Sequence, residues 1–246
     1  MAAANDKKLE SGEEQMYSKI YSPTFLSIVY DVLVLKFNMR YMWGCRTDKV
    51  LEPFFAENFS RRHLDIGVAT GYLPAVSLGR PFRSQSKQQL TLVDLNPNPL
   101  EAAKCRILSK AANTTVECVV ADVTTPLPDE LKGAEFDSIS MFNLFHCIPG
   151  REKFEAFSTY KDLLSEGGVL SGCTVLGGKH ATNKINRLYV KFYNKKGVFH
   201  NWEDQREDFE AALNKNFEEV ETTLVGMTLL FRATKPRKTQ RDIEYV

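Results

Sequence analysis

An excess of charge of either sign is missing from this sequence. Its 246 residues include 32 lysine and arginine residues against 31 aspartate and glutamate residues, for a formal net charge of +1. This balance provides no overall basic field to gather nucleic acid or an anionic membrane. The one basic run lies in the polar tail, at Lys235, Arg237, Lys238 and Arg241. We therefore expect neither nucleic acid nor a membrane as a partner.

Cysteine pairs and long apolar runs are missing as well. The five cysteines form no C-x-x-C pair and their number is odd, which disfavours a disulfide framework or a thiolate zinc site and fits a reducing compartment. No run of about 18 apolar residues is present to span a membrane. The polar start, MAAANDKKLESGEEQ, has no apolar signal core. We expect a cytoplasmic protein without a metal.

What the sequence has is an ordinary globular composition and an alternation of strand-like and helix-like segments. Apolar residues make up 43% and charged residues 26%, and the length suffices for one large domain. Strands are expected at 63–67, 90–95, 115–123, 136–144 and 168–177, and helices between them at 70–79, 100–112 and 152–167. This alternation predicts βαβ units and a parallel sheet whose strand C-terminal ends form one ligand-binding edge.

The alternation stops after the fifth expected strand. Residues 217–234 hold two β-type runs that pivot near Gly226 with no room for a helix between them, so the last strand must pair antiparallel. Before them, residues 176–216 form an insertion with helices near 181–195 and 203–215. We expect this insertion to lie over the active edge.

The chain is expected to form a single domain, because it contains no internal repeat and no low-complexity linker. Apolar residues recur at helical spacing near the N-terminus, which predicts a helical cap or lid. The expected parts are a disordered N-terminal tail (1–15), one domain (16–234) that begins with the cap (16–59), and a polar C-terminal tail (235–246).

A glycine-containing turn follows the first expected strand, in HLDIGVATGY (63–72). The dinucleotide fingerprint G-x-G-x-x-G would require glycine at positions 67, 69 and 72, but Ala69 and Tyr72 occupy two of them. A phosphate-binding loop would require Gly-Lys-Ser/Thr about five residues after Gly67, and that is also missing. The turn is therefore unsuited to a pyrophosphate. What remains is an acid followed by G-x-A-x-G.

This pattern resembles that of the class I S-adenosylmethionine-dependent methyltransferases, whose turn commonly reads D/E-x-G-x-G-x-G. The likeness continues through LTLVDLNPN, VVADV, FDSISMFNLFHCIPG, LLSEGGVLSGCTVLG and the closing hairpin, in that order. The segment IVYDVLVLKFNMRYMWGC is similar to the lid helix of small stand-alone members. The resemblance implies an α/β, Rossmann-like fold. Its mostly parallel sheet would have seven strands in the order 3-2-1-4-5-7-6, with the last strand antiparallel and helices on both faces.

S-adenosylmethionine carries an ammonium, a carboxylate and a ribose diol but no phosphate, and acids at strand ends match these groups. Asp94 ends the second strand, where a carboxylate accepts two charge-assisted hydrogen bonds from the diol. Asp122 ends the third strand beside the expected adenine, and Asp65 lies under the turn, where it meets the ammonium. The residues expected at the cofactor and its product, S-adenosylhomocysteine, are Asp65, Gly67, Ala69, Gly71, Asp94, Leu95, Asp122, Val123 and Asn143.

These residues also have structural alternatives. An aspartate after a strand also caps the following helix, and Asn143 is suited to capping a turn as well as to binding the methionine part. Gly67 and Gly71 allow a close backbone approach and a tight bend. Ala69 replaces the middle glycine and adds one methyl group, which either narrows the pocket or fits a backbone with φ below zero.

Methyl transfer is an in-line displacement in which the protein positions the acceptor and excludes water, and a base is needed only if the proton leaves early. His146, just past the fourth strand, is the candidate catalytic residue; the alternative is a structural histidine bonded to a backbone carbonyl. Candidate substrate contacts are Tyr21 and Tyr30 in the cap and His200 in the insertion. Core packing is the alternative for the tyrosines, and a surface turn for His200. His63, at the start of the first strand, is expected to be structural.

We predict an enzyme that transfers a methyl group from S-adenosylmethionine to a hydroxyl or amine of a small organic molecule. The insertion and the cap favour an enclosed pocket, and analogy at family level points to a secondary metabolite. We expect a monomer or a homodimer. Two alternatives stay open: a protein of this fold that binds the cofactor without transferring methyl, as a cyclase, binding subunit or scaffold, and an NAD-dependent oxidoreductase.

Overall fold

The computed structural model describes residues 26–80 and 87–237, with side chains from Asp31 onward. The predicted N-terminal tail, the start of the cap, Tyr21 and all but the first residues of the C-terminal tail lie outside this description. Tyr30 belongs to a described helix, but its side chain is outside as well. No helix within the described ranges is long and apolar enough to cross a membrane.

Seven strands form one sheet in the order β3-β2-β1-β4-β5-β7-β6. The first five run parallel, and β7 pairs antiparallel with both β5 and β6. The expected strand order and the antiparallel last strand are therefore confirmed. The bounds are β1 (Arg62–Ile66), β2 (Gln88–Asp94), β3 (Thr114–Val120), β4 (Phe136–Phe142), β5 (Leu164–Val175), β6 (Phe217–Val225) and β7 (Thr228–Pro236).

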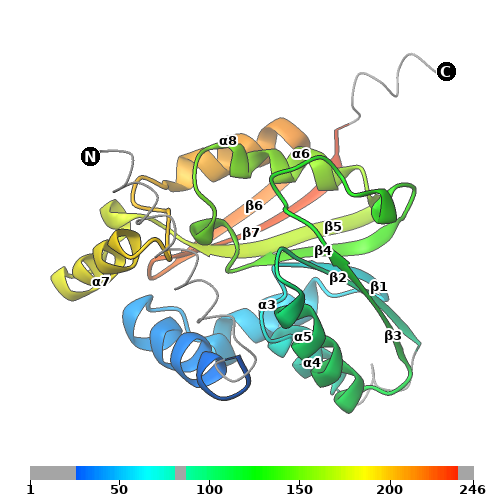
Figure 1. The fold of residues 1–246 in the computed structure, drawn as a ribbon. Coiled ribbons are helices and arrows are strands. Elements are labelled where there is room, and N and C mark those ends of the chain that lie inside the picture. Colours follow the sequence, from blue (N-terminus) through cyan, green and yellow to red (C-terminus); the bar gives the residue numbers. More distant parts are fainter. Residues whose placement is uncertain (1–25, 81–86, 238–246) are drawn as a thin grey trace, which may run out of the picture.

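Helices cover both faces of the sheet (Figure 1). On one face lie α3 (Glu52–Glu57), α4 (Tyr72–Leu78) and α5 (Pro97–Lys110), and on the other lie α6 (Glu155–Lys161) and α8 (Arg206–Asn216). Each face has its own apolar core, and the central strands are buried between the two. This two-sided covering leaves only the strand ends available for a ligand.

Helix α5 begins earlier than the sequence pattern indicated. The Asn96 side chain accepts a hydrogen bond from the backbone N–H of Asn98 at 2.9 Å, and Pro97 occupies the first helical position. An asparagine cap followed by proline is a strong helix start, because the cap satisfies a free N–H and proline has none to satisfy. The helix therefore begins directly after the end of β2, which places Asp94 at its entrance.

One expected helix end is wrong. The helix predicted to reach Gly167 ends at Lys161, and β5 begins at Leu164. The backbone N–H of Phe136 donates to the carbonyl of Leu163 at 2.8 Å, so sheet pairing begins almost directly after the helix. The glycine instead lies in a shift of the β4–β5 register, with φ of +74°.

The cap and the insertion meet at the end of the sheet where β5 ends (Figure 1). The cap contains η1 (Leu26–Met42), a helix of the π type, and η2 (Thr47–Leu51); α7 (Lys184–Lys195) belongs to the insertion. The Tyr189 hydroxyl donates to Asn38 at 3.2 Å, and its ring lies 5.6 Å from that of the buried Trp43. The division into cap, domain and insertion stays a prediction. Four short 3₁₀ turns complete the fold: η3 (Asp129–Leu131), η4 (Phe145–Cys147), η5 (Glu152–Phe154) and η6 (Gly178–His180).

Candidate active site

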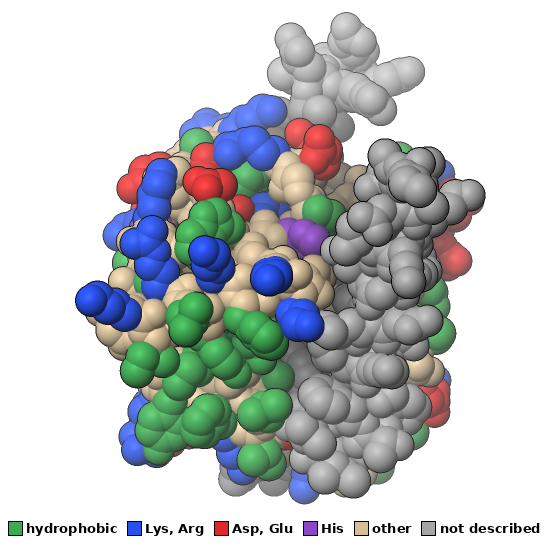
Figure 2. Space-filling model, turned by 60° about the vertical axis from the view of Figure 1, so that its left-hand side comes forward, with side chains coloured by type: hydrophobic (Ala, Val, Ile, Leu, Met, Phe, Trp, Pro, Cys, Tyr) green, Lys and Arg blue, Asp and Glu red, His purple; other side chains and the backbone are tan. Residues whose placement is uncertain are grey.

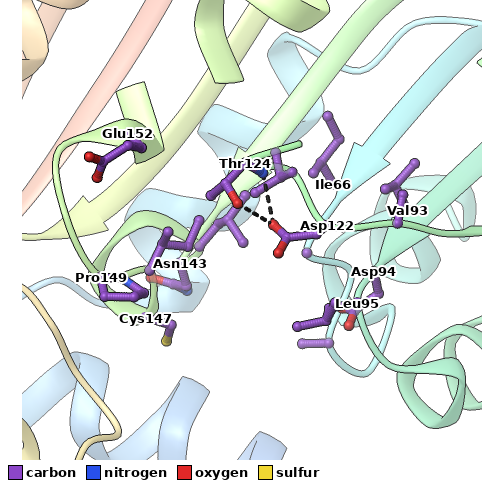
Figure 3. A pocket seen from close by; sticks show the side chains of 16 residues that line it. Ile66, Val93, Asp94, Leu95, Asp122, Thr124, Asn143, Cys147, Pro149 and Glu152 are labelled. Atoms are coloured by element: carbon purple, nitrogen blue, oxygen red, sulfur yellow. Dashed lines mark hydrogen bonds between the residues drawn. The ribbon is translucent and has the colours of Figure 1, made fainter. Parts of the chain in front are cut away.

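A cavity of about 350 Å³ opens at the C-terminal ends of the parallel strands. Asp94 ends β2 and Asp122 follows β3, and in Figure 3 Asn143, after β4, lies across the cavity from Asp94. This is the edge where open α/β sheets bind ligands. Most of the remaining wall is apolar: Ile66, Ala69, Val93, Leu95, Ala121, Val123, Leu144, Ile148 and Pro149.

A smaller cavity adjoins the first one at the glycine turn. Gly67, Ala69 and Asn143 line both cavities. Asp65 lines the smaller cavity, together with Leu35 from η1. The two cavities therefore adjoin at the glycine turn, with Asp94 and Asp122 in the larger one and Asp65 in the smaller one.

Asp94 is a buried carboxylate, with 9% of its surface exposed. The backbone N–H of Asn96 donates to its Oδ1 at 3.0 Å. Burial raises the pKa of Asp94 to about 6, and hydrogen bonds from the backbones of Asn96 and Ala69 oppose the rise. No ion pair among the described residues includes Asp94. Its charge is therefore balanced by N–H dipoles alone.

Asp65 ends a buried chain of hydroxyl and imidazole groups. The Ser140 hydroxyl donates to Asp65 Oδ1 at 2.5 Å, and His63 Nε2 lies 2.9 Å from the same hydroxyl. His63 Nδ1 lies 2.7 Å from the Ser138 hydroxyl, so both ring nitrogens have structural partners. Burial raises the pKa of Asp65 to about 7; the Ser140 hydrogen bond lowers it, and the charge of Asp94 raises it.

Asp122 combines a turn-forming role with a place in the cavity wall. The Thr124 backbone N–H donates to Asp122 Oδ1 at 2.8 Å, and the Thr124 hydroxyl donates to the same oxygen at 2.7 Å (Figure 3). One carboxylate oxygen of Asp122 therefore has the structural role of closing a turn. Hydrogen bonds from the described residues do not occupy Oδ2, which leaves it as an acceptor for a ligand.

The glycine turn uses left-handed backbone at three positions. Gly67, Ala69 and Gly71 have φ of +74°, +48° and +65°. The expectation of a φ below zero at Ala69 is wrong, because the tight connection from β1 to α4 requires a left-handed residue there. This conformation costs an L-residue about 1–2 kcal/mol. Ala69 lines both cavities, which favours the alternative that it narrows the site.

Comparison with known proteins identifies the family. A family model described as a methyltransferase domain matches residues 64–170. The O-methyltransferase NEC2 of Pyricularia oryzae is 52% identical, with 94% of this chain and 96% of that protein covered. The chain belongs to the class I S-adenosylmethionine-dependent methyltransferases. This membership confirms the predicted methyl transfer to small molecules and excludes the nicotinamide oxidoreductase.

Two further proteins illustrate the range of the methyltransferase's relatives. The Physcion biosynthesis cluster O-methyltransferase of Aspergillus chevalieri is 39% identical, with 89% of this chain and 94% of that protein covered. Among solved structures, the DhpI–SAH complex has 16% identity and a TM-score of 0.59, covering 94% of this chain and 98% of that one. At that identity the likeness shows the shared fold alone.

Most residues predicted at the cofactor line this site in the methyltransferase, but Gly71 does not. A Cβ on Gly71 would lie 2.8 Å from the Cα of Ala103. The glycine therefore allows α5 to pack closely against the turn, which is a structural role.

His146 lies behind the cavity wall. In the 3₁₀ turn η4, successive side chains point about 120° apart, so Cys147 lines the cavity while His146 points into the core. Its Nδ1 lies 3.4 Å from the Thr174 hydroxyl, and its ring lies 4.4 Å from that of Phe199. Burial lowers the pKa of His146 to about 3, with a smaller contribution from the charge of Lys153. Its catalytic role stays a prediction.

His200 lies next to His146 through the backbone. Its N–H donates to the His146 carbonyl at 2.7 Å, and its own carbonyl accepts from Lys153 Nζ at 3.5 Å. Lys153 is buried and pairs with Asp204 at 2.6 Å. This ion pair joins the part of the insertion that precedes α8 to η5, which follows β4. The described cavities do not include His200, and its contact with substrate stays a prediction.

The cap is tied to the glycine turn by a polar cluster. Arg106 of α5 donates to Asp31 of η1 at 2.5 Å and to the Thr70 hydroxyl at 2.8 Å. Thr70 in turn donates to Asp31 at 2.7 Å. Leu35, further along η1, lines the smaller cavity. The cluster therefore holds the cap over the part of the site that contains Asp65.

The residues that form the cavity wall opposite Asp94, and those that η1 contributes, were not predicted from the sequence. The signals were present, because the quoted motifs FNLFHCIPG and IVYDVLVLKF contain most of these residues. The motifs do not show which way each side chain points in a 3₁₀ turn or in a cap helix. The missed residues include Leu35, Thr70, Leu144, Cys147, Ile148, Pro149 and Glu152.

Proposed function

We propose that this methyltransferase methylates a hydroxyl oxygen of a small secondary metabolite. Three relatives support oxygen as the acceptor atom, because NEC2, the Aspergillus chevalieri protein and adaD of Aspergillus niger are all named O-methyltransferases. The biosynthesis-cluster name of the second supports a secondary metabolite. When bound, S-adenosylmethionine would supply the methyl group from its sulfonium and leave as the neutral thioether S-adenosylhomocysteine.

The observation that carries the proposal is the pair of buried carboxylates in adjoining cavities. Asp65 and Asp94 both have raised pKa values, since burial leaves their charge without a cationic partner among the described residues. The ammonium and the ribose diol of S-adenosylmethionine are the donors that such carboxylates need. The site also holds no lysine or arginine within the described lining, which fits a cofactor without phosphate.

Each acid receives a separate part of the cofactor in this proposal. Asp94 accepts from the ribose diol, and Asp122 accepts from the adenine amine through its unoccupied Oδ2. Asp65 and Asn143 bind the methionine part. Leu95 and Val123, which line the larger cavity with Asp122, provide apolar walls for the adenine, together with Gly67, Ala69 and the other lining residues.

In this proposal the enzyme accelerates methyl transfer by positioning the acceptor and excluding water. No histidine lines the cavities within the described ranges, and the lining beyond the three acids and Glu152 carries no ionisable group other than Cys147 and Tyr72. The cap contributes by covering the smaller cavity with Leu35. The O–CH3 bond would form as the S–CH3 bond of the cofactor breaks, and the acceptor hydroxyl would lose its proton late, to solvent.

Asp94→Ala tests the cofactor site. We expect the affinity for S-adenosylhomocysteine to fall at least tenfold, since a charge-assisted hydrogen bond contributes about 1.5–3 kcal/mol. Isothermal titration calorimetry measures the change, and circular dichroism checks the fold. Asp129→Ala, at an exposed aspartate on η3, is the matched control. Unchanged affinity in Asp94→Ala would remove this residue from the site.

The acceptor atom is tested with matched phenols and anilines. We expect methyl ethers and released S-adenosylhomocysteine, identified by mass spectrometry with labelled cofactor. Preferential methylation of the anilines would reject oxygen as the acceptor. Cofactor binding without transfer to any of a broad acceptor panel would instead favour the alternative of a protein that no longer transfers methyl.

A further inference from the structure

Two helices at the active end of the molecule expose rows of large apolar side chains. On α7, Ile185, Leu188 and Phe192 are 68%, 69% and 51% exposed. Their spacing of three and four residues places them on one side of the helix. On η1, Phe37 and Tyr41 are 46% and 56% exposed, with ring centroids 5.2 Å apart. Scattered exposed apolar residues are ordinary, but aligned rows indicate an interaction surface.

These rows belong to one surface, because η1 and α7 pack against each other. Tyr189 donates to Asn38 at 3.2 Å, and Asn38 donates to Tyr193 at 3.5 Å, on the inner sides of the two helices. Figure 2, turned to show this end, displays apolar side chains gathered in one area with Lys and Arg side chains along its border. We call the exposed sides of η1 and α7 the cap face.

Basic side chains accompany the apolar rows on both helices. The stretches 32–47 and 167–202 contain no aspartate or glutamate at all. None of the cations on the cap face forms an ion pair with another described residue. The balanced net charge of the chain thus conceals a local concentration of positive charge. On α7 these cations are Lys184, Arg187, Lys191, Lys195 and Lys196; on η1 they are Lys36 and Arg40, which also line a cavity together with Asp48 and Glu52.

We propose that the cap face docks on an anionic membrane surface. A helix with separate apolar and basic sides, rich in lysine and arginine, is the pattern of interfacial helices that lie in the headgroup region. The proposal reverses the expectation drawn from net charge, because a membrane responds to the local face rather than to the whole chain. It does not rest on the proposed function, since docking requires neither cofactor nor acceptor.

A second copy of the chain fits this face less well. An isologous contact places the same patch on both subunits, so the basic rows of one copy would meet those of the other. Like charges brought together in this way disfavour association. An anionic lipid surface instead matches both features of the cap face, since phosphate headgroups attract the cations and acyl chains receive the apolar rows.

Docking through this face would bring the active edge next to the lipid. Leu35 lies on η1 and lines the smaller cavity, while Phe37 and Tyr41 of the same helix point outward. The cap therefore separates the site from the docking surface by a single helix. An apolar acceptor dissolved in the membrane would have a short path to the site.

Vesicle flotation with the full chain tests the proposal. The probes are vesicles of phosphatidylcholine alone and vesicles of phosphatidylcholine mixed with phosphatidylserine. We expect binding to the anionic vesicles that weakens as salt is added, because salt screens the attraction, and at least tenfold weaker binding to the neutral ones. No binding to the anionic vesicles would overturn the proposal.

Two triple variants separate the contributions of charge and apolar contact. K184Q/K191Q/K195Q should weaken binding to anionic vesicles about a hundredfold, since each basic side chain near such a surface contributes about fivefold. I185S/L188S/F192S should weaken it at least tenfold because it removes the exposed apolar row, and circular dichroism checks that α7 stays helical.

The matched control is K87Q/K110Q/K215Q, which removes three exposed lysines at the opposite edge of the sheet. It should bind like the parent chain. Equal loss in the control and in the cap-face variant would overturn the proposal in favour of an unspecific charge effect. A concentration-dependent dimer that I185S/L188S/F192S abolishes would overturn it in favour of a second copy as the occupant.

Discussion

Asp65 and Asp94 show how burial alone changes the chemistry of a side chain. Their pKa values rise to about 7 and about 6, from the ordinary aspartate value of 3.8, chiefly because the charged form loses water. A raised pKa in the folded state means that the charged form is disfavoured by folding. The protonated carboxyls therefore contribute to the free energy of unfolding. This contribution is fully present below the ordinary pKa and is lost as pH rises through about 6 to 7.

The pH dependence of cofactor affinity follows from the same shifts, with the opposite sign. Asp65 and Asp94 accept hydrogen bonds and attract an ammonium best when charged. The affinity for S-adenosylhomocysteine should therefore rise as pH increases through about 6 to 7, while the unliganded protein loses free energy of unfolding between about pH 4 and pH 7. Calorimetry and chemical denaturation at several pH values measure the two trends.

Asp94→Asn supplies the control for this pH dependence. The amide cannot ionise, so the part of the affinity change centred near pH 6 should disappear. The part due to Asp65 should move to lower pH, because the charge of Asp94 no longer raises the pKa of Asp65. An affinity in the parent chain that stays flat from about pH 5 to pH 8 would show that these carboxylates do not titrate in this range.

His146→Ala separates the structural and catalytic alternatives for this residue. Because the ring packs on Phe199 in the core, we expect the free energy of unfolding to fall by about 2–4 kcal/mol. With its pKa near 3, His146 is neutral throughout the working range, so the shape of the kcat–pH profile should not change. A lost inflection near neutral pH would instead identify His146 as a base. His180→Ala, on η6, is the control.

At the scale of single elements, the turn between β1 and α4 is defined by backbone conformation and by close packing. Gly71 combines a positive φ with a contact to α5, whereas Gly133 has φ of +77° and open space around it. The two glycines therefore distinguish the cost of a left-handed backbone from the cost of a clash.

Gly71→Ala and Gly133→Ala should differ in stability. At Gly133 the change costs about 1 kcal/mol, the penalty of a left-handed alanine. At Gly71 the added Cβ also meets the Ala103 backbone, which raises the cost to about 3 kcal/mol. Urea denaturation measures both. Equal losses would mean that α5 moves away from the turn without penalty.

At the scale of the whole molecule, contacts between distant segments complete the site. The Asp31–Thr70–Arg106 cluster joins the cap, the glycine turn and α5. The Lys153–Asp204 ion pair joins η5, after β4, to the part of the insertion that precedes α8. Neither contact is local in sequence, and both lie next to segments that line the cavities.

Lys153→Met should cost about 3–5 kcal/mol of unfolding free energy, because it leaves the mostly buried Asp204 without its partner. The double variant Lys153→Met/Asp204→Asn should lose less, since the unpaired charge is gone. Thermal and urea denaturation compare the two. A double variant that is less stable than the single one would show that the pair itself, rather than the isolated charge, determines the loss.

Much of the site was predictable because it depends on strand ends. Asp94 and Asp122 were identified from their places after apolar runs, and parallel strands bring such ends to one edge. Leu35 and Cys147 were missed because they come from the cap and from a 3₁₀ turn, where sequence spacing alone does not show which way a side chain points. Tyr21 and the side chain of Tyr30 lie outside the described residues, so their predicted contacts stay predictions.

The amino-acid sequence by itself determined the alternation of strands and helices and the final hairpin. These features depend on local periodicity and on segment length, since a connection without room for a helix cannot join parallel strands. Only the tertiary structure decided the left-handed backbone of Ala69, the inward direction of His146 and the joining of η1 with α7 into one exposed face. Those outcomes depend on packing between segments far apart in the chain, which no local pattern encodes.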